Sequence, residues 1–245
     1  MIRAFTRAAL LLFFVNPVTV SFSQILQTAA PSFVQVSEER LQRVDGLMQQ
    51  YIDSGWINGA TAIIARNGKI IYYKGLGYDD AGTKKPLQKD AIMRIASQTK
   101  AITSVAVMML YEEGKFLLDD AVSKYIPEFK NPVVLDSFNE SDTTYTTVPA
   151  KSEITIRQLL THTSGIQYAQ IGSKIFKAIY AKAGIVAGIG VDRIKLADVM
   201  KKLGPLPLAH QPGEKFTYGV NTDVLGYLVE VVSGMSFDDY LKKRI

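Results

Sequence analysis

The sequence contains no cysteine and only two histidines among its 245 residues. Without cysteine the chain has no disulfide framework, no thiolate metal ligand and no lipidated cysteine. With so few histidines, a zinc site would need carboxylates at a suggestive spacing, and none occurs. We therefore expect neither a metal nor an organic cofactor.

Dense clusters of one charge sign are also absent. The chain carries 28 Lys and Arg against 23 Asp and Glu, a net charge of +5, and no basic block is dense enough for a nucleic-acid-binding arm. We therefore expect no nucleic-acid partner. A hydrophobic content of 47% and a charged content of 21% are ordinary for a globular protein. The length allows one large domain or two small ones.

The N-terminal segment has no acidic side chain and no apolar run long enough to span a bilayer. Two arginines precede the apolar run 8–15, and Ser21 and Ser23 stand at the −3 and −1 positions of a cleavage site. This pattern predicts an export signal over residues 1–23; a retained membrane anchor or a buried segment are the alternatives. Cleavage would leave no stable membrane insertion, and a cysteine-free exported chain suits a bacterial periplasm or secretion.

Two β-prone runs flank Asn67-Gly68 within the segment Ala60–Tyr78. This dipeptide predicts a hairpin of adjacent antiparallel strands, because both turn positions require positive φ. Ahead of the hairpin, Ser37 is placed to cap a helix. After it, strand signals are weak, the threonine-rich segment Asn139–Ala150 is predicted as a surface excursion, and Gly172–Gly190 is left unassigned. Further helices are predicted at residues 196–203, 223–233 and after Ser236.

The most apolar helix-like run, Arg94–Asp120, begins with Ser97 and Lys100 three residues apart. A helix that is apolar on all sides is expected to be buried on all sides, and Gly114 is predicted to end it. On a helix, residues i and i+3 share one face, about 5–6 Å apart at Cβ. The serine hydroxyl and the lysine amine are therefore expected to touch.

This contact would have a chemical use. A serine hydroxyl is a poor nucleophile unless a neighbour takes its proton. Burial disfavours the lysine ammonium, and the positive end of a helix does so as well while favouring an oxyanion. Ser97 and Lys100 are therefore candidates for a nucleophile and its base. A helix-capping serine beside a solvated lysine is the alternative that the spacing alone leaves open.

Several segments in order resemble the serine β-lactamase and penicillin-binding protein superfamily, in particular its class C-like branch of carboxylesterases, D-amino peptidases and acyltransferases. Besides the hairpin, the matching segments are MRIASQTKAITSVAVMMLYEEGKFLLDDAVSKYIPEF, ITIRQLLTHTSGI and PGEKFTYGVNTDVLGYLVEVVSG. The resemblance covers roughly Ser37–Ile245. It implies an α+β, β-lactamase/transpeptidase-like fold, with an antiparallel sheet flanked by helices and a mainly helical region.

The resemblance also implies roles for three residues. Ser97 would be the acylated nucleophile, Lys100 its base and Tyr218 the group that relays the proton to the leaving group. The second family motif is Tyr-x-Asn or Ser-x-Asn, whereas valine stands two residues after Tyr218 here and Asn221 comes one residue later. A valine at that position resembles the esterase and acyltransferase members.

Three further residues are candidates for contact with a substrate. Gln98 and Tyr168 are predicted to line the pocket. Asn221 is predicted to bind the substrate on a different face, with a helix N-cap as the alternative.

The histidines are predicted to be structural. His162 lies two residues before Ser164, but such close neighbours on a turn do not aim at each other as a Ser-His-Asp triad requires, and Gly-x-Ser-x-Gly is absent. His162 is therefore predicted to make a structural hydrogen bond under the site. His210 lies in a proline-rich loop and is assigned a structural role too.

The third family motif, three central strands and a closing helix are expected beyond Ile245, and without them a sheet edge and an apolar face would be exposed. Residues 37–245 are thus predicted to be the N-terminal portion of a hydrolase domain. The expected function is an exported serine hydrolase acting on a small molecule, with an ester or acyl-transfer substrate preferred. A β-lactamase, a D-alanyl-D-alanine carboxypeptidase, a penicillin-binding sensor without turnover and an inactive remnant are the alternatives. The oligomeric state is left open.

Overall fold

The computed structural model describes residues 26–185 and 194–245, and the chain divides into two compact units, the first ending at Met93 and the second spanning Arg94–Ile245. The predicted export signal lies outside the described residues. None of the helices in the described ranges is both long enough and apolar enough to cross a membrane.

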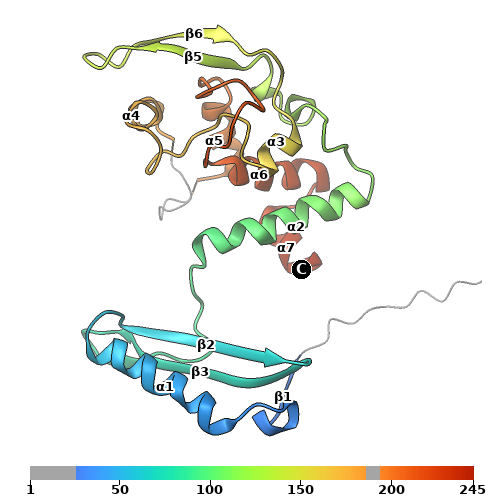
Figure 1. The fold of residues 1–245 in the computed structure, drawn as a ribbon. Coiled ribbons are helices and arrows are strands. Elements are labelled where there is room, and N and C mark those ends of the chain that lie inside the picture. Colours follow the sequence, from blue (N-terminus) through green and yellow to red (C-terminus); the bar gives the residue numbers. More distant parts are fainter. Residues whose placement is uncertain (1–25, 186–193) are drawn as a thin grey trace, which may run out of the picture. The chain divides into compact units, whose positions relative to one another are not determined.

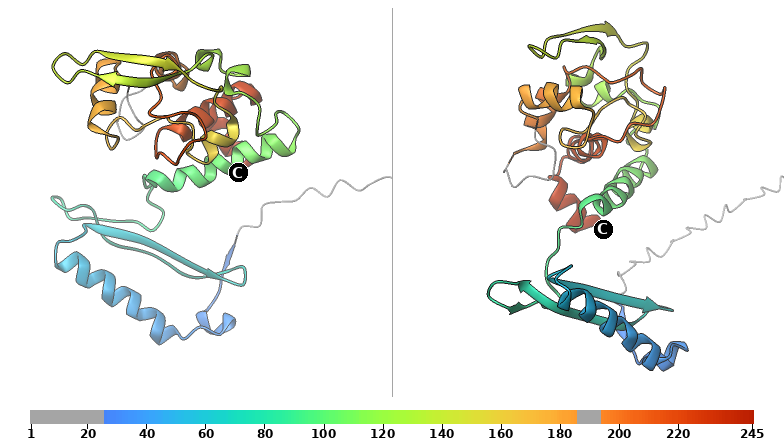
Figure 2. Two further views of the ribbon diagram at one scale, coloured as in Figure 1. Left: turned by 45° about the horizontal axis from the view of Figure 1, so that its top comes forward. Right: turned by 60° about the vertical axis from the view of Figure 1, so that its left-hand side comes forward.

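Unit 1 is a small sheet with one long helix. Its sheet has the strand order β1-β3-β2, with β1 parallel and β2 antiparallel to β3. The short strand β4 pairs antiparallel with the C-terminal end of β3. Helix α1 lies along one face of the β2–β3 ribbon (Figures 1 and 2). The elements are β1 (Gln27–Thr28), η1 (Pro31–Val34), α1 (Glu38–Asp53), β2 (Gly59–Arg66), β3 (Lys69–Asp80) and β4 (Lys85–Pro86).

Both local predictions for unit 1 are confirmed. The Ser37 hydroxyl accepts a hydrogen bond from the Arg40 amide at 3.3 Å and so caps α1. Asn67 and Gly68 have φ of 50° and 70° and form the two-residue turn between β2 and β3. Short-range signals alone therefore specify the helix start and the hairpin.

Unit 2 is mainly helical, with one two-stranded hairpin. The hairpin β5–β6 and helix α2 lie on opposite sides of α3, α5 and α6 (Figures 1 and 2). The elements are η2 (Ala96–Gln98), α2 (Thr99–Glu112), η3 (Val122–Lys124), η4 (Pro127–Phe129), β5 (Val133–Phe138), β6 (Tyr145–Pro149), α3 (Ile156–Leu160), α4 (Lys174–Lys182), α5 (Leu196–Leu203), α6 (Asn221–Ser233) and α7 (Phe237–Arg244).

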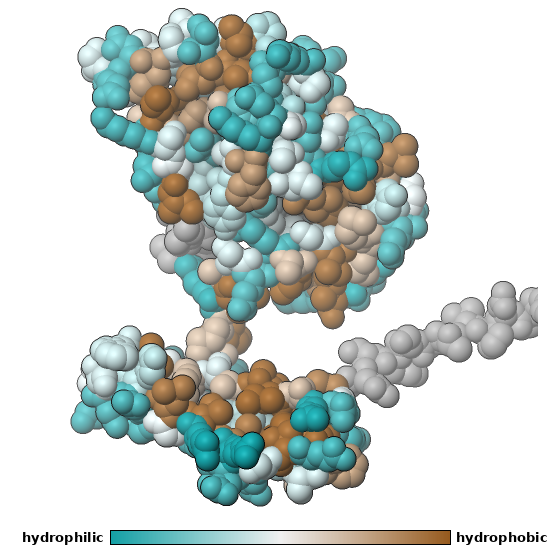
Figure 3. Space-filling model, viewed as in Figure 1, coloured by the Kyte–Doolittle hydropathy of each residue, from teal (hydrophilic) through white to brown (hydrophobic). Residues whose placement is uncertain are grey.

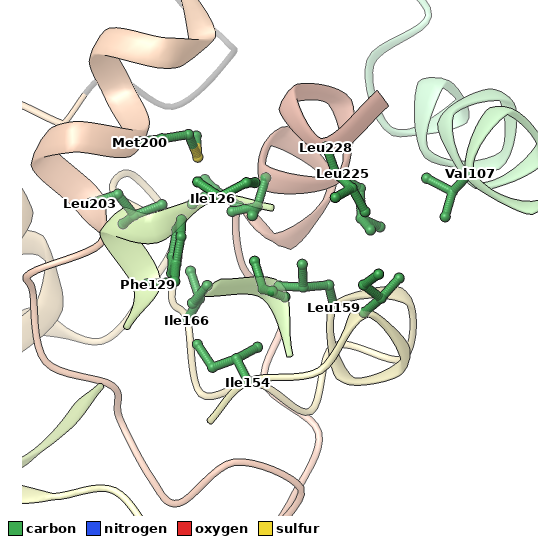
Figure 4. Packing of buried hydrophobic residues seen from close by; sticks show 14 of the residues in the cluster. Val107, Ile126, Phe129, Ile154, Leu159, Ile166, Met200, Leu203, Leu225 and Leu228 are labelled. Atoms are coloured by element: carbon green, nitrogen blue, oxygen red, sulfur yellow. The ribbon is translucent and has the colours of Figure 1, made fainter. Parts of the chain in front are cut away.

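The core of unit 2 is built around α6. This helix packs against α2, α3, α5 and α7. Its Leu225 and Leu228 are buried, and they face apolar side chains from the surrounding elements, among them Val107, Leu159 and Met200 (Figure 4). Burying each such side chain contributes about 1.5–3 kcal/mol relative to leaving it in water.

One prediction for unit 2 is wrong, and two segments contain elements that the sequence did not predict. Helix α2 buries one face through Thr103, Ala106, Val107 and Leu110, while Val105 is 50% exposed, so the helix is not buried on all sides. The threonine-rich segment lies on the surface as predicted, and within it β6 pairs antiparallel with β5, because β-branched residues favour a pleated strand. Asn139 and Asp142 form the turn by accepting backbone hydrogen bonds. The unassigned segment contains α4.

The remaining helix predictions are confirmed with small shifts. Gly114, with φ of 69°, follows α2 as predicted. Helix α6 begins two residues before the predicted start, at Asn221. Ser236 caps α7 by accepting from the Asp239 amide at 3.1 Å.

Candidate active site

Ser97 lies in the short 3₁₀ turn η2 that leads directly into α2. The residue before it, Ala96, has φ of 46°, a left-handed conformation that costs a non-glycine residue strain and that the surrounding structure must hold in place. Ser97 is not the helix cap, because the N-cap of α2 is Gln98 and no side chain makes a capping hydrogen bond there. The capping alternative for Ser97 is therefore wrong.

Lys100 stands on the first turn of α2, where the spacing predicts it. Its Nζ donates a hydrogen bond to Ser97 Oγ at 3.3 Å. Lys100 is only partly exposed, and in the described part of the chain no carboxylate forms an ion pair with it. The lysine is thus directed at the serine and not at an acid.

Tyr218 approaches the same hydroxyl from the loop before α6. Its OH lies 2.8 Å from Ser97 Oγ, and Lys100 Nζ lies 4.8 Å from the centroid of its ring. The fold therefore brings together all three residues that the family resemblance selected, although Tyr218 lies 121 positions from Ser97.

Backbone contacts hold the Tyr218 segment close to residues 162–167. The Thr217 amide donates to the His162 carbonyl at 2.7 Å, and the Val220 amide donates to the Gln167 carbonyl at 3.2 Å. Gly219 packs so tightly that a Cβ there would collide with the Ile166 carbonyl oxygen. Glycine at this position is therefore a condition of the close approach.

The surroundings of Tyr218 favour loss of its proton. The hydrogen bond from Lys100 is the largest influence that lowers the pKa of Tyr218, followed by the hydrogen bond with Ser97; burial opposes both, the charge of Lys100 adds to the lowering, and the charge of Asp223 opposes it. The proton acceptor is the phenolate, and a lowered pKa raises the fraction of Tyr218 in that form near neutral pH. The site therefore pairs a hydroxyl with a group suited to take its proton.

Tyr168 lies beside Tyr218 and Lys100. Its ring stacks on that of Tyr218 with centroids 5.6 Å apart and planes 9° apart, and Lys100 Nζ lies 5.8 Å from its centroid. Burial, assisted by the charge of Asp223, raises the pKa of Tyr168, so this phenol stays protonated. Tyr168 is only 7% exposed, which leaves little of it for contact with a substrate.

The other two residues predicted to contact a substrate, Gln98 and Asn221, differ in their exposure to solvent. Gln98 is exposed and adjacent to Ser97 in the chain. Asn221 is fully buried, and its amide bonds Ser164 and His162. This placement argues against contact with a substrate. The N-cap alternative is wrong as well, because Val220 is the N-cap of α6 and Asn221 is its first residue.

Both histidines make the structural hydrogen bonds that the sequence predicts. His210 is buried, with Nδ1 2.9 Å from the Gln211 carbonyl and Nε2 2.7 Å from Thr217 Oγ1. His162 bonds Asn221 and also stacks on Tyr218. Sequence reasoning missed Ser164 as the partner of Asn221, since nothing local connects two residues 57 positions apart.

Metal-ligating side chains do not gather at this site. Across residues 26–185 and 194–245, no group of three or more His, Asp or Glu side chains is arranged to hold an ion.

Comparison with known proteins identifies the family and the fold of this chain. The beta-lactamase family model matches residues 44–245, so the chain belongs to the beta-lactamase family, and its fold is the α+β, β-lactamase/transpeptidase-like fold. The superfamily resemblance seen in the sequence is thereby confirmed.

Three individual proteins show how similar this chain is to other proteins in sequence and fold. Esterase EstB of Burkholderia gladioli is 33% identical over 192 residues, which are 78% of this chain and 45% of EstB. The structure of EstCE1, a hydrolase with promiscuous acyltransferase activity, matches with a TM-score of 0.70 and 32% identity over 84% of this chain and 50% of that one. Simvastatin synthase (LovD) from Aspergillus terreus matches with a TM-score of 0.67 and 27% identity over 85% of this chain and 51% of that one. The chain spans about half the length of these relatives.

Proposed function

We propose that this chain carries the nucleophile of a serine hydrolase that works through an acyl-enzyme on Ser97. One observation carries the proposal: Ser97 Oγ lies within hydrogen-bond distance of both Tyr218 OH, at 2.8 Å, and Lys100 Nζ, at 3.3 Å. A nucleophile in contact with two groups able to take and pass on its proton is the arrangement that covalent catalysis requires.

The steps follow from these contacts. Tyr218 acts as the phenolate, a form that Lys100 favours by lowering its pKa, and takes the Ser97 proton as Oγ attacks the carbonyl carbon of the substrate. The tetrahedral intermediate collapses when the leaving group departs with the proton that Tyr218 returns to it, leaving an ester on Ser97. Water then attacks this ester and gives a proton to the Tyr218 phenolate. Tyr218 returns that proton to Ser97 Oγ as the bond between Oγ and the acyl carbon breaks and the acid is released. The Ser97 amide at the start of α2 is a donor for the oxyanion.

An ester or acyl-transfer substrate is the proposed substrate class. Val220 and Asn221, which follow Tyr218, are 2% and 0% exposed. Neither residue therefore offers an amide group that would bind the amide of a β-lactam or peptide. Among the relatives, EstB is an esterase and EstCE1 is a hydrolase with acyltransferase activity. These likenesses support a small-molecule ester as the substrate.

Covalent labelling tests the proposal. The purified chain is mixed with a fluorophosphonate and, separately, with benzylpenicillin, and intact mass and peptide mapping follow. We expect a phosphonate adduct on Ser97 that is absent in Ser97→Ala and strongly reduced in Lys100→Ala. No adduct in a folded chain would contradict the proposal. A stable penicillin adduct without turnover would favour the penicillin-binding sensor instead.

Export is part of the proposal. A signal over residues 1–23 would place the enzyme in a bacterial periplasm or outside the cell. Expression of the full sequence in a bacterial host, followed by N-terminal sequencing of the periplasmic protein, tests this. A mature chain that begins at Gln24 is the expected result, and a cytoplasmic chain that retains Met1 would contradict it.

A further inference from the structure

A directed chain of hydrogen bonds lies behind Tyr218. The Ile166 amide donates to Ser164 Oγ at 3.1 Å, and the Ser164 hydroxyl donates to Asn221 Oδ1. The Nδ2 group of Asn221 lies 2.9 Å from His162 Nδ1. Ser164 and Asn221 are both fully buried, so these bonds are made away from water, where an unpaired polar group would be costly.

The direction of this chain fixes the proton on His162. Because Asn221 uses its oxygen to accept from Ser164, it presents its NH₂ group to His162, and an NH₂ group only donates. The Gly219 amide also points at His162 Nδ1, at 3.4 Å. With two donors aimed at it, Nδ1 must be an acceptor, so the ring is neutral and carries its proton on Nε2.

Two further influences keep the ring neutral. Burial lowers the pKa of His162, and the charge of Lys100 lowers it further. A proton on Nδ1 would also set an N–H group against those of Asn221 and Gly219. Geometry and electrostatics therefore favour the same protonation state.

The neutral ring of His162 lies against Tyr218. The two rings stack with centroids 5.1 Å apart and planes 28° apart. His162 also bonds both chain neighbours of Tyr218, through its carbonyl to the Thr217 amide at 2.7 Å and through Nδ1 to the Gly219 amide. One residue thus contacts Tyr218 at its ring and at the backbone on either side.

We infer that His162 is a positioning residue: a neutral imidazole, oriented by Asn221 and Ser164, that holds the Tyr218 hydroxyl beside Ser97. This inference rests on the proposed function and gives Asn221 a role different from substrate binding. His162 makes no hydrogen bond to Ser97 or Lys100 among the described residues, so it acts through Tyr218 and not on the reacting atoms. A displacement of Tyr218 by about 1 Å would cost on the order of 100-fold in rate.

Two substitutions at His162 distinguish the effect of its ring from the effect of its backbone conformation. His162 has φ of 55°, a left-handed conformation that asparagine tolerates well and phenylalanine poorly. His162→Asn keeps a residue suited to the backbone and removes the ring. His162→Phe keeps a ring for stacking and strains the backbone. A purely structural role predicts that the asparagine variant is the better of the two, whereas a positioning role predicts the reverse.

The measurement is the rate constant for fluorophosphonate labelling of Ser97, from pH 6 to pH 10, on chains shown to be folded by circular dichroism. We expect labelling to slow by about 100-fold in His162→Asn and by clearly less in His162→Phe. Phe116→Leu is the matched control, because Phe116 is a buried aromatic in the segment after α2 that also contacts neighbouring rings. It should lower stability and leave the labelling rate of the folded chain unchanged.

A second readout is the imidazole ¹⁵N spectrum, which is simple because the chain has two histidines. We expect His162, assigned through its loss in His162→Asn, to be neutral with the proton on Nε2 at pH 7. A proton on Nδ1, or an asparagine variant that labels as fast as the phenylalanine variant, would overturn the inference. An unlabelled parent chain would instead overturn the proposed function, and the inference with it.

Discussion

The two units of this chain differ in what holds them together. Unit 2 has a continuous core of buried apolar side chains drawn from α2, α3, α4, α5, α6, α7 and the segments between them. In unit 1 the helix α1 buries none of its 16 residues. The buried apolar residues of unit 1 are Val34, Ile71, Tyr72 and Leu87.

This difference shows that well-formed elements do not imply a core. Unit 1 has a capped helix and a regular hairpin, yet apolar side chains remain on its surface (Figure 3). Trp56 is 71% exposed and Ile63 is 57% exposed. A small sheet with one helix buries too little apolar area to be stable by a wide margin on its own.

The candidate catalytic groups follow the same division. Ser97, Lys100 and Tyr218, together with the positioning residue His162, belong to unit 2. A catalytic arrangement must be held to within a fraction of an ångström, which a packed core does better than a loosely packed unit. The proposed chemistry therefore lies in the unit that has the continuous core.

The largest effect is expected from removing the nucleophile. Ser97→Ala should lower hydrolysis of a p-nitrophenyl ester by at least about 10⁴-fold, since the other groups of a catalytic set achieve little without the nucleophile. Trp56→Ala in unit 1 is the control and should leave the rate of folded protein unchanged. A similar loss in both variants would break the assignment of the chemistry to unit 2.

The second effect concerns Lys100 and pH. Because Lys100 lowers the pKa of Tyr218, the labelling rate of the parent should rise with pH through that lowered pKa, as the phenol loses its proton. In Lys100→Ala the pKa moves back up, so the rise should shift to higher pH. Near pH 7 the rate should fall by about 10²–10⁴-fold, the usual contribution of a proton-transfer group. An unshifted profile would show that Lys100 does not act through Tyr218.

The third effect compares the packing of the two units directly. Leu228 on α6 is fully buried, and Leu228→Ala should reduce the free energy of unfolding by about 2–5 kcal/mol. Ile63 on β2 is 57% exposed, and Ile63→Ala should cost less than about 1 kcal/mol. Urea denaturation followed by circular dichroism measures both. Equal losses would mean that unit 1 is packed as firmly as unit 2.

Sequence reasoning reached the features that depend on neighbours in the chain. The Ser37 cap and the Asn67-Gly68 turn are local, and the contact between Ser97 and Lys100 follows from helical spacing. Tyr218 lies far from Ser97 along the chain, so its place in the site came from family resemblance and not from spacing.

The features that sequence reasoning missed depend on long-range contacts. The role of Asn221 was misassigned because its partner Ser164 is 57 residues away. Helix α2 was expected to be buried on all sides because every face is apolar, but only one face meets α6 in the described residues. The segment Asn139–Ala150 has a polar composition, which concealed strand-forming threonines that pair with β5.

The smallest effect tests whether α1 depends on local interactions alone. Ser37→Ala removes the cap of a helix with no buried residue and should cost about 1 kcal/mol, so amide hydrogen exchange in α1 should speed up about fivefold while that in α6 stays unchanged. Ser236→Ala, the equivalent change at the start of α7, is the matched control. Helix α7 is anchored by Tyr240, which is 1% exposed, so its exchange should change less. Equal acceleration in both helices would show that burial does not protect α7. The contrast between the units would then hold for α6 but not for α7.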